Sequence, residues 1–315
     1  MRALSLLFAG AVLGADTPAL AVTIDWVTVG HPGNADDIQT GFGSVPYTYR
    51  ISKYEVTNAQ YAEFLNAVAA TDPSGLYNPT MGSLRGGIIR SGSSGTYQYS
   101  LISGREQMPV VYVSFYDALR FANWMNNGQP SGAQDATTTE DGSYTITEQG
   151  IAENTISRGA SARFLLPDRD EWYKAAYHDA LGVQVTSYFD FPTGSNSDPV
   201  CSSPTSTPNH ANCNNQVGDL TSVGSYSGSS SPWGAFDLAG NVWEWTEEVY
   251  FGDDRLREIR GASFVDGGGY HATFDLAIFP TDESIVGFRL AMIPEPGTGV
   301  LVGFGLLGLA RRRRA

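Results

Sequence analysis

The chain of 315 residues is long enough for one large domain or two, and its hydrophobic content of 42% is enough to build a core. Its formal net charge of −14 argues against a nucleic-acid partner, because a phosphate backbone repels an acidic surface. The 36 glycines and 16 prolines are scattered rather than periodic, which excludes a fibrous chain and indicates a loop-rich α+β domain with short helices and small antiparallel sheets.

Residues 1–21 have the pattern of an export signal. Arg2 supplies a positive start, residues 4–13 are apolar, and Ala19-Leu20-Ala21 is a small-residue cleavage site. Cleavage there leaves Val22 as the new N-terminus. The alternation over residues 23–29 then predicts a first strand.

Capping signals predict three helices. Each signal pairs a hydroxyl or carboxylate at the cap with a Gln, Asp or Glu three residues later, and the pairs are Thr57 with Gln60, Ser114 with Asp117, and Asp168 with Glu171. The apolar stripes that follow are expected to be core rather than a cofactor site.

Two histidines near these elements are not expected to have a catalytic or metal-binding role. His31 lies in a loop rich in Gly, Pro, Asn and Asp, and is expected to be solvated. His178 falls in the last turn of the third helix, where a partly cationic imidazole suits the negative end of the helix dipole.

The stretch Asp237 to Trp245 reads Asp-Leu-Ala-Gly-Asn-Val-Trp-Glu-Trp, which fits neither a half-buried strand nor a helical stripe and predicts an irregular turn. Its two indoles are expected to anchor in the core, each with a partner for its N–H. The carboxylates of Asp237 and Glu244, with the backbone carbonyls of Gly240 and Val242, form a set of hard oxygens that suits structural calcium.

This stretch resembles the signature of the formylglycine-generating enzyme family, the sulfatase-modifying factors. Further segments match the family in order, and together they cover roughly residues 24 to 292. They are Glu55–Asn58 with Tyr61 and Phe64, Met108–Val110 with Ala118 and Trp124, Leu166–Pro167 with Glu171–Trp172, Arg260–Phe264, and Gly287–Arg289. The resemblance implies one domain over residues 22–292 with the family's α+β fold, which is related to the C-type lectin fold.

The resemblance also implies a second calcium site ahead of the tryptophan turn. There, Asn212 and Asp219 would offer side-chain oxygens, and Cys213 and Thr221 would offer main-chain ones.

Cys201 and Cys213 are the only cysteines of the chain, and they lie in a loop rich in Ser, Pro and Asn. A disulfide is expected, because an oxidising compartment favours pairing. A copper or zinc site is the alternative, although the spacing is not CxxC and only His210 lies nearby.

The catalytic positions of the family are changed. Members that oxidise a substrate cysteine carry two copper-binding cysteines just after the Arg-Gly-Gly-Ser-Phe segment, and Asp266 and His271 stand at those positions here. A carboxylate and an imidazole are harder ligands than the thiolates that hold Cu(I), so copper is not expected. Ser263 is retained and would mark the remaining pocket. A solvated glycine-rich loop is preferred over a new metal or acid–base site at Asp266 and His271.

Residues 293–315 resemble the tripartite PEP-CTERM sorting signal of Gram-negative bacteria. A Pro-Glu-Pro segment at 294–296 precedes an apolar stretch at 299–310 and four arginines at 311–314. The stretch is shorter than the roughly 20 residues of a comfortable membrane span, which favours a transient membrane contact over a permanent anchor. The resemblance implies a sorting protease of the exosortase type as a partner.

The expected function is therefore that of an exported, surface-sorted domain in the periplasm, on the outer surface or in the extracellular matrix. It would bind an unidentified peptide, glycan or matrix ligand or serve as a structural module. The alternative is a formylglycine-generating oxidase, or a related metal-dependent oxidoreductase, that acts on a protein cysteine with altered ligands.

Overall fold

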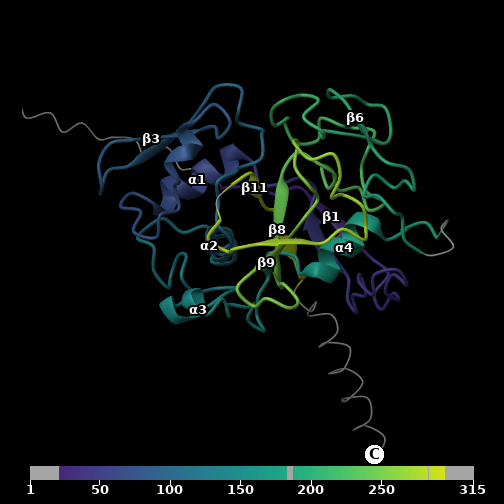
Figure 1. The fold of residues 1–315 in the computed structure, drawn as a ribbon. Coiled ribbons are helices and arrows are strands. Elements are labelled where there is room, and N and C mark those ends of the chain that lie inside the picture. The colour runs from purple at the N-terminus through teal and green to yellow at the C-terminus, as the bar shows by residue number, and fades with distance from the viewer. Residues whose placement is uncertain (1–20, 183–186, 283, 295–315) are drawn as a thin grey trace, which may run out of the picture.

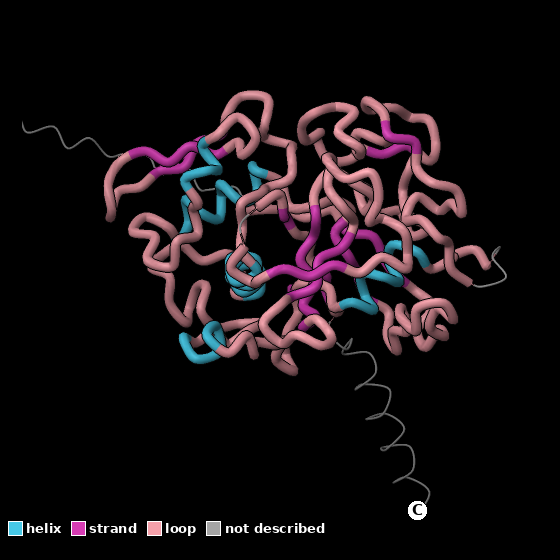
Figure 2. Tube along the Cα trace, in the orientation of Figure 1, coloured by secondary structure: helices cyan, strands magenta, loops and turns pink. Residues whose placement is uncertain are grey.

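The computed structural model describes residues 21–182, 187–282 and 284–294. Loops and turns make up most of the trace, with short helices and strands set between them (Figure 2). This is the loop-rich α+β architecture that the glycine and proline content predicts. The α-helices of the described residues are α1 (Asn58–Val68), α2 (Phe115–Asn126), α3 (Glu148–Ala152) and α4 (Arg169–Tyr177), and one 3-10 turn, η1, covers Pro79–Gly82.

The three predicted helices begin where their capping signals place them. At α1, the Thr57 hydroxyl accepts from the Gln60 N–H, and the Gln60 side chain accepts from the Thr57 N–H at 2.9 Å. The same reciprocal pair forms at Ser114 for α2 and at Asp168 for α4. Each such cap stabilises its helix by about 1 kcal/mol. The predicted starts of α1, α2 and α4 are confirmed.

Two four-stranded sheets carry the domain (Figure 1). The first joins distant parts of the chain in the order β1-β2-β12-β5, all antiparallel, with bounds Trp26–Val29, Tyr49–Ser52, Ala291–Met292 and Phe164–Leu165. The second has the order β10-β9-β8-β11, with bounds Leu276–Ile278, Arg257–Arg260, Trp243–Val249 and Val286–Gly287.

Two small ribbons complete the strands. They are β3 (Ile88–Ser91) with β4 (Gln98–Leu101), and β6 (Val200–Cys201) with β7 (His210–Ala211). The expectation of small antiparallel sheets holds for most pairs. The β6–β7 and β8–β11 pairs are parallel instead, which corrects the expectation for these two pairs.

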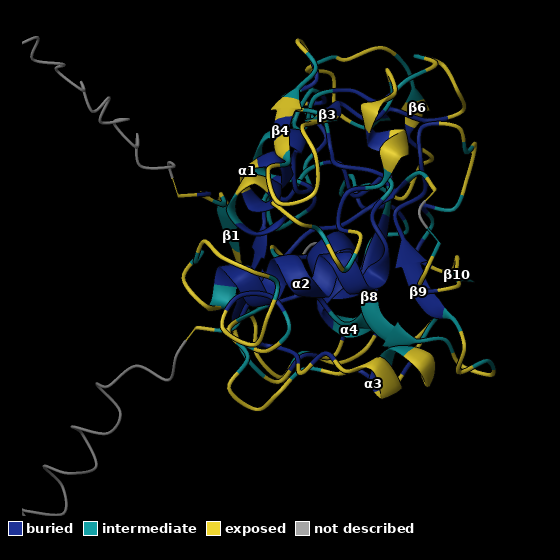
Figure 3. Cartoon of the chain, turned by 90° about the vertical axis from the view of Figure 1, so that its left-hand side faces the viewer, coloured by how far each residue is buried: buried dark blue, intermediate teal, exposed yellow. Residues whose placement is uncertain are grey.

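The main core packs around α2, which is buried along its length in Figure 3. Aromatic rings of α1 and α2 meet there: Phe64 packs edge-on against Phe121 at a centroid distance of 5.3 Å, and Phe121 packs edge-on against Phe288 at 5.4 Å. A second cluster forms on α4 around Trp172, Tyr173 and Tyr177. The helical stripes are core, as expected.

The two histidines near α4 differ from their sequence-based interpretation. His178 is 5% exposed, and its ring stacks on Trp233. Burial, with lesser contributions from Lys174 and His31, lowers its pKa to about 4, so the predicted partial positive charge is wrong. His31 is exposed but not simply solvated, since its ring lies edge-on against Trp233 at 5.2 Å.

A fully buried ion pair connects the two four-stranded sheets. Glu244 on β8 accepts from Arg289 at both carboxylate oxygens, each at 2.6 Å. The same carboxylate accepts from the Trp172 indole of α4 at 2.8 Å, and Arg289 also donates to the Ser52 carbonyl of β2 at 3.0 Å. This one bidentate pair therefore joins β8, α4, β2 and the segment before β12.

We expect Arg289→Met to lower the free energy of unfolding by about 3–5 kcal/mol, because it leaves the Glu244 carboxylate buried without a counter-charge. The double variant Arg289→Met/Glu244→Leu should recover part of the loss. Urea unfolding measures both. Arg255, which pairs with Asp253 on an exposed loop, gives the control: Arg255→Met should stay close to wild type. An Arg289→Met variant as stable as this control would contradict the interpretation.

Candidate functional site

The turn at 237–242 is held in a conformation that its sequence makes possible. Asp237, Gly240 and Asn241 all have left-handed φ values, of 59°, 80° and 63°. At Gly240 only glycine fits, because an added Cβ would lie 2.1 Å from the Asn212 carbonyl oxygen. The Asn241 N–H donates to that same carbonyl at 2.9 Å. The turn is therefore fixed against the segment that contains Asn212.

Both indoles of the signature have partners for their N–H groups, as predicted. Trp245 is fully buried and donates to the Val113 carbonyl at 3.0 Å. Trp243 is half-buried and donates to the Asp266 carboxylate at 3.0 Å. The expectation of an irregular turn holds only as far as Val242, because strand β8 begins at Trp243 and pairs with β9.

Asp266 is tied to Ser263 as well as to Trp243. Its Oδ2 atom accepts from the Ser263 N–H at 3.0 Å and from the Ser263 hydroxyl at 2.5 Å. Ser263 is 1% exposed, so its hydroxyl faces the carboxylate rather than solvent. One carboxylate oxygen thus takes three donors, which makes Asp266 a brace between β8 and the loop after β9.

His271 has a different set of neighbours. Its ring lies edge-on against Phe191 at 5.0 Å, and its Nδ1 atom contacts the Thr273 hydroxyl at 2.9 Å. No hydrogen bond or ion pair links His271 to Asp266 within the part of the chain that the structure describes. The structure therefore shows no direct contact between the two residues that the family resemblance places at the cysteine positions.

Ala262 stands directly before Ser263 and is strained. It is fully buried with a φ of 65°, a left-handed conformation that glycine adopts freely and that costs an alanine roughly 1–2 kcal/mol. The surrounding contacts, including those of Asp266, hold this segment in place.

The side chains of the first set of expected calcium ligands also make protein contacts. The Glu244 carboxylate accepts from Arg289 and Trp172, and Asp237 accepts from the Gly224 N–H at 2.5 Å. Their role as calcium ligands, together with the main-chain oxygens of Gly240 and Val242, stays a prediction.

The second set is also engaged in protein contacts. The Asp219 carboxylate pairs with Arg105 at 2.8 Å. The Asn212 Nδ2 atom donates to the Asp219 carbonyl at 2.9 Å, and the Thr221 N–H donates to the Asn241 carboxamide at 3.0 Å. The Oδ1 atom of Asn212 is buried without a hydrogen-bond partner among the described residues, so it is available to a ligand. Calcium binding stays a prediction.

Asn241 and Glu55 are the site residues that the sequence interpretation left out. The Asn241 carboxamide accepts from Asn212 at 3.2 Å and donates to Glu55 at 3.1 Å, so it joins the signature turn to the segments that contain these two residues. Burial raises the pKa of Glu55 well above its ordinary value, with the nearby charge of Asp237 as a further cause. Burial also raises the pKa of Asp237 from 3.8 to about 6. The only sequence signal was that Glu55 lies in a matching segment and Asn241 in the signature turn.

The disulfide between Cys201 and Cys213 is confirmed, with the two Cα atoms 4.9 Å apart. It excludes the copper or zinc alternative for these sulfurs. Among the residues that the structure describes, no group of three or more His, Cys, Asp or Glu side chains is arranged to hold a metal ion. Within the same residues, every helix is too short or too polar to cross a bilayer.

Calcium and chelator titrations test the ligand sets. Because the sequence predicts structural calcium and the Asn212 Oδ1 atom is buried without a hydrogen-bond partner, we expect the melting temperature of the calcium-treated protein to exceed that of the EDTA-treated protein by several degrees. Differential scanning fluorimetry measures both. Equal melting temperatures in millimolar calcium and in EDTA would contradict the predicted sites.

The raised pKa of Asp237 predicts a pH-dependent loss of stability. The folded-state pKa of about 6 lies above the ordinary 3.8, so protonation of Asp237 stabilises the folded protein. This stabilisation is fully present below pH 3.8 and is lost as pH rises through 6. We expect the free energy of unfolding of Asp237→Asn to rise relative to that of wild type by at most about 3 kcal/mol between pH 4 and pH 7. Urea unfolding at several pH values measures the difference. Exposed Asp36→Asn is the control, and a difference for Asp237→Asn that is flat in pH would refute the prediction.

Comparisons with known proteins place this geometry in a family. The family model of the sulfatase-modifying factor enzyme 1-like domain matches residues 44–293. A PEP-CTERM protein-sorting motif matches residues 293–314, which indicates export and surface sorting in Gram-negative bacteria and implies processing of the exosortase type. The expected export signal at residues 1–21 lies outside the described residues except for Ala21, and so does the chain from residue 295 to 315.

Solved structures share the fold at low identity. CarF is 20% identical, with 87% of this chain and 99% of CarF covered at a TM-score of 0.55. The Treponema denticola variable protein 1 is 19% identical, with 85% and 95% covered at a TM-score of 0.52. No curated protein is similar enough to match the chain. With its signature turn, its buried ion pair and the match over residues 44–293, the chain belongs to the sulfatase-modifying factor enzyme 1-like family.

Proposed function

We propose that this protein is a non-oxidising member of its family, a binding or structural module of the cell surface or extracellular matrix. The sorting motif supports a destination at the surface. The intact scaffold of buried ion pair, capped helices and signature turn supports a stable folded domain. The changed catalytic positions support the loss of oxidase chemistry.

The observation that carries the proposal is the set of contacts made by Asp266. Its Oδ2 atom accepts from Trp243 and twice from Ser263, so the position has become part of the framework. A carboxylate is also a hard ligand, whereas Cu(I) prefers soft thiolates. His271, with Phe191 and Thr273 as its neighbours, supplies an imidazole in place of a thiolate.

Cys201 and Cys213 cannot replace the two copper-binding cysteines that the family resemblance implies. The chain has two cysteines, and both belong to the disulfide that staples the loop before the signature turn. A disulfide has no thiolate to offer as a ligand or nucleophile. A Cu(I) site of the kind implied by the family resemblance therefore has no thiolate in this chain.

Oxygen consumption with a cysteine-containing sulfatase peptide and copper tests the proposal. We expect no turnover and no Cu(I) retained after desalting of the wild-type protein. The matched variant is Asp266→Cys/His271→Cys, which restores two thiols at the family positions and should retain copper if the scaffold still permits it. Peptide turnover or tightly held Cu(I) in the wild-type protein would overturn the proposal, whatever the variant does.

A further inference from the structure

The first sheet has two different faces. On one face, Val29 and Ile51 pack into the cluster around α4. Because side chains alternate along a strand, the residues between them in sequence point to the opposite face, and the strand register aligns them across the sheet. This outer face consists of Trp26 and Thr28 of β1, Arg50 and Ser52 of β2, Met292 of β12 and Phe164 of β5.

Two aromatic rings cover part of the outer face. Trp26 and Phe164 come from the two edge strands, β1 and β5, and their ring centroids are 5.9 Å apart. Both side chains are partly exposed, and both pack against the main core. The exposed Arg163 guanidinium lies 5.4 Å from the Phe164 ring centroid. The face therefore offers aromatic surface with a cation beside it.

Arg50 adds a second cation to the outer face. It is exposed, and it makes no ion pair, side-chain hydrogen bond or cation–π contact among the residues that the structure describes. Every other arginine in that part of the chain contacts a carboxylate, a carbonyl oxygen or an aromatic ring. In a chain with a formal net charge of −14, the positive charge of Arg50 is thus available to an anionic partner.

The described chain leaves the domain at this same sheet. β12 ends at Met292, the Ile293 N–H donates to the Arg163 carbonyl at 3.0 Å, and Pro294 is exposed. The sorting motif begins at residue 293, and the apolar stretch of the sequence begins at residue 299. The five residues between 294 and 299 span at most about 18 Å. An apolar stretch in a bilayer therefore holds the first sheet within that distance of the headgroups.

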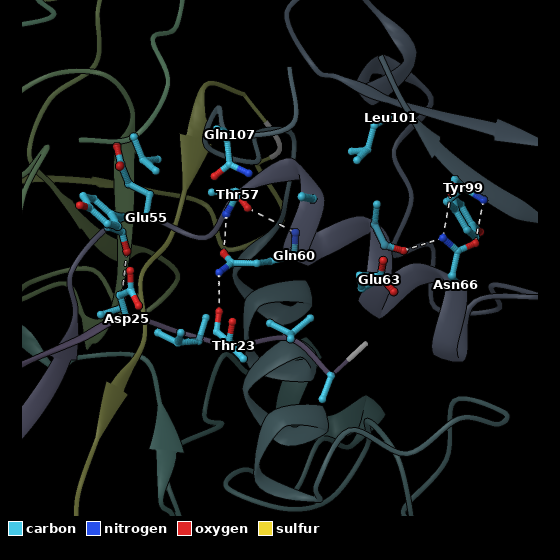
Figure 4. Close-up of a pocket in the computed structure, with 18 of the residues that line it drawn as sticks. Thr23, Asp25, Glu55, Thr57, Gln60, Glu63, Asn66, Tyr99, Leu101 and Gln107 are labelled. Atoms are coloured by element: carbon cyan, nitrogen blue, oxygen red, sulfur yellow. Dashed lines mark hydrogen bonds between the residues drawn. The ribbon is translucent and has the colours of Figure 1, made fainter. Parts of the chain in front are cut away.

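The segment before β1 keeps Trp26 in a fixed place. The Gln60 side chain of α1 accepts from the Thr57 N–H and donates to the Thr23 carbonyl at 2.9 Å, which ties this segment to the helix (Figure 4). Asp25 lines the pocket beside α1 in the same view, whereas Trp26 does not line it. The acidic side chain next to Trp26 in sequence therefore belongs to another part of the surface.

We propose that the outer face docks onto the surface of an anionic bilayer. Trp26 and Phe164 lie at the level of the headgroups, where tryptophan is enriched in membrane proteins, and Arg50 and Arg163 contact lipid phosphates. The acidic remainder of the protein is repelled by the same bilayer, which gives docking one preferred orientation. This goes beyond the proposed module function, because it assigns a membrane-facing surface to the folded domain, and it stands whether or not oxidase activity is lost.

Tryptophan quenching in vesicles tests the proposal. The full chain is reconstituted into vesicles of phosphatidylcholine and phosphatidylglycerol whose acyl chains carry bromine, a short-range quencher of indole fluorescence. We expect the quenched fraction to fall by about threefold in Trp26→Phe, because Trp26 is the indole placed at the bilayer. Trp233→Phe is the matched control. Trp233 is also partly exposed but packs against the cluster around α4, so its replacement should leave the quenching close to wild type.

Arg50→Glu in the same vesicles tests the charge. Because Arg50 has no partner among the described residues, we expect an unchanged melting temperature, and we expect a quenched fraction about threefold below wild type because the face is then repelled. Arg255→Glu makes the same change of net charge two residues before β9, and Figure 3 places β1 and β9 on opposite sides of the domain. This control should keep wild-type quenching.

Wild-type quenching should also fall when phosphatidylglycerol is left out of the vesicles. Quenching that does not depend on phosphatidylglycerol would show that the apolar stretch alone holds the chain at the membrane, and would overturn the proposal. So would an equal loss in Trp26→Phe and Trp233→Phe, an equal loss in Arg50→Glu and Arg255→Glu, or a wild-type protein whose indoles are not quenched.

Discussion

Glu244 and Arg289 are both fully buried, so each would be an unpaired charge in the protein interior without the other. Their bidentate contact places β8 next to the segment before β12, and the Trp172 indole adds α4 to the same point. Because β12 pairs with β2 and β5, this pair connects both four-stranded sheets. The signature turn ends at Val242, directly before β8, so the contact that fixes β8 also limits where the turn can lie.

Asp266, one of the two residues that the family resemblance places at the cysteine positions, is bound into the framework. Asp266 takes three hydrogen bonds on one oxygen, from donors that lie on β8 and in its own loop. These bonds hold the loop in which Ala262 keeps a left-handed backbone that a glycine would adopt without strain. A carboxylate, with its strong acceptor oxygens, is therefore well suited to holding the loop in place.

Features that depend on neighbours in sequence were predictable. The capping boxes of α1, α2 and α4 follow from residues three positions apart, and the disulfide follows from two cysteines in an exported chain. Partners far along the chain were not. The sequence does not show that Arg289, 45 positions after Glu244, lies beside it as an ion-pair partner. The sequence predicts a partly cationic His178, because it does not show that Trp233, which lies in another segment, stacks on the ring and helps to bury it.

The disulfide has a consequence for when the domain is completed. Cys213 is fully buried beside Asn212, whose carbonyl receives the N–H of Asn241 in the signature turn. Closing a loop of this length stabilises a fold by about 3 kcal/mol in the chain-entropy model. Thiols stay reduced in the cytosol and pair after secretion, so a newly made chain lacks this cross-link while it is still inside the cell. Secretion thus supplies a covalent step of maturation, and the loop lacks this constraint until then.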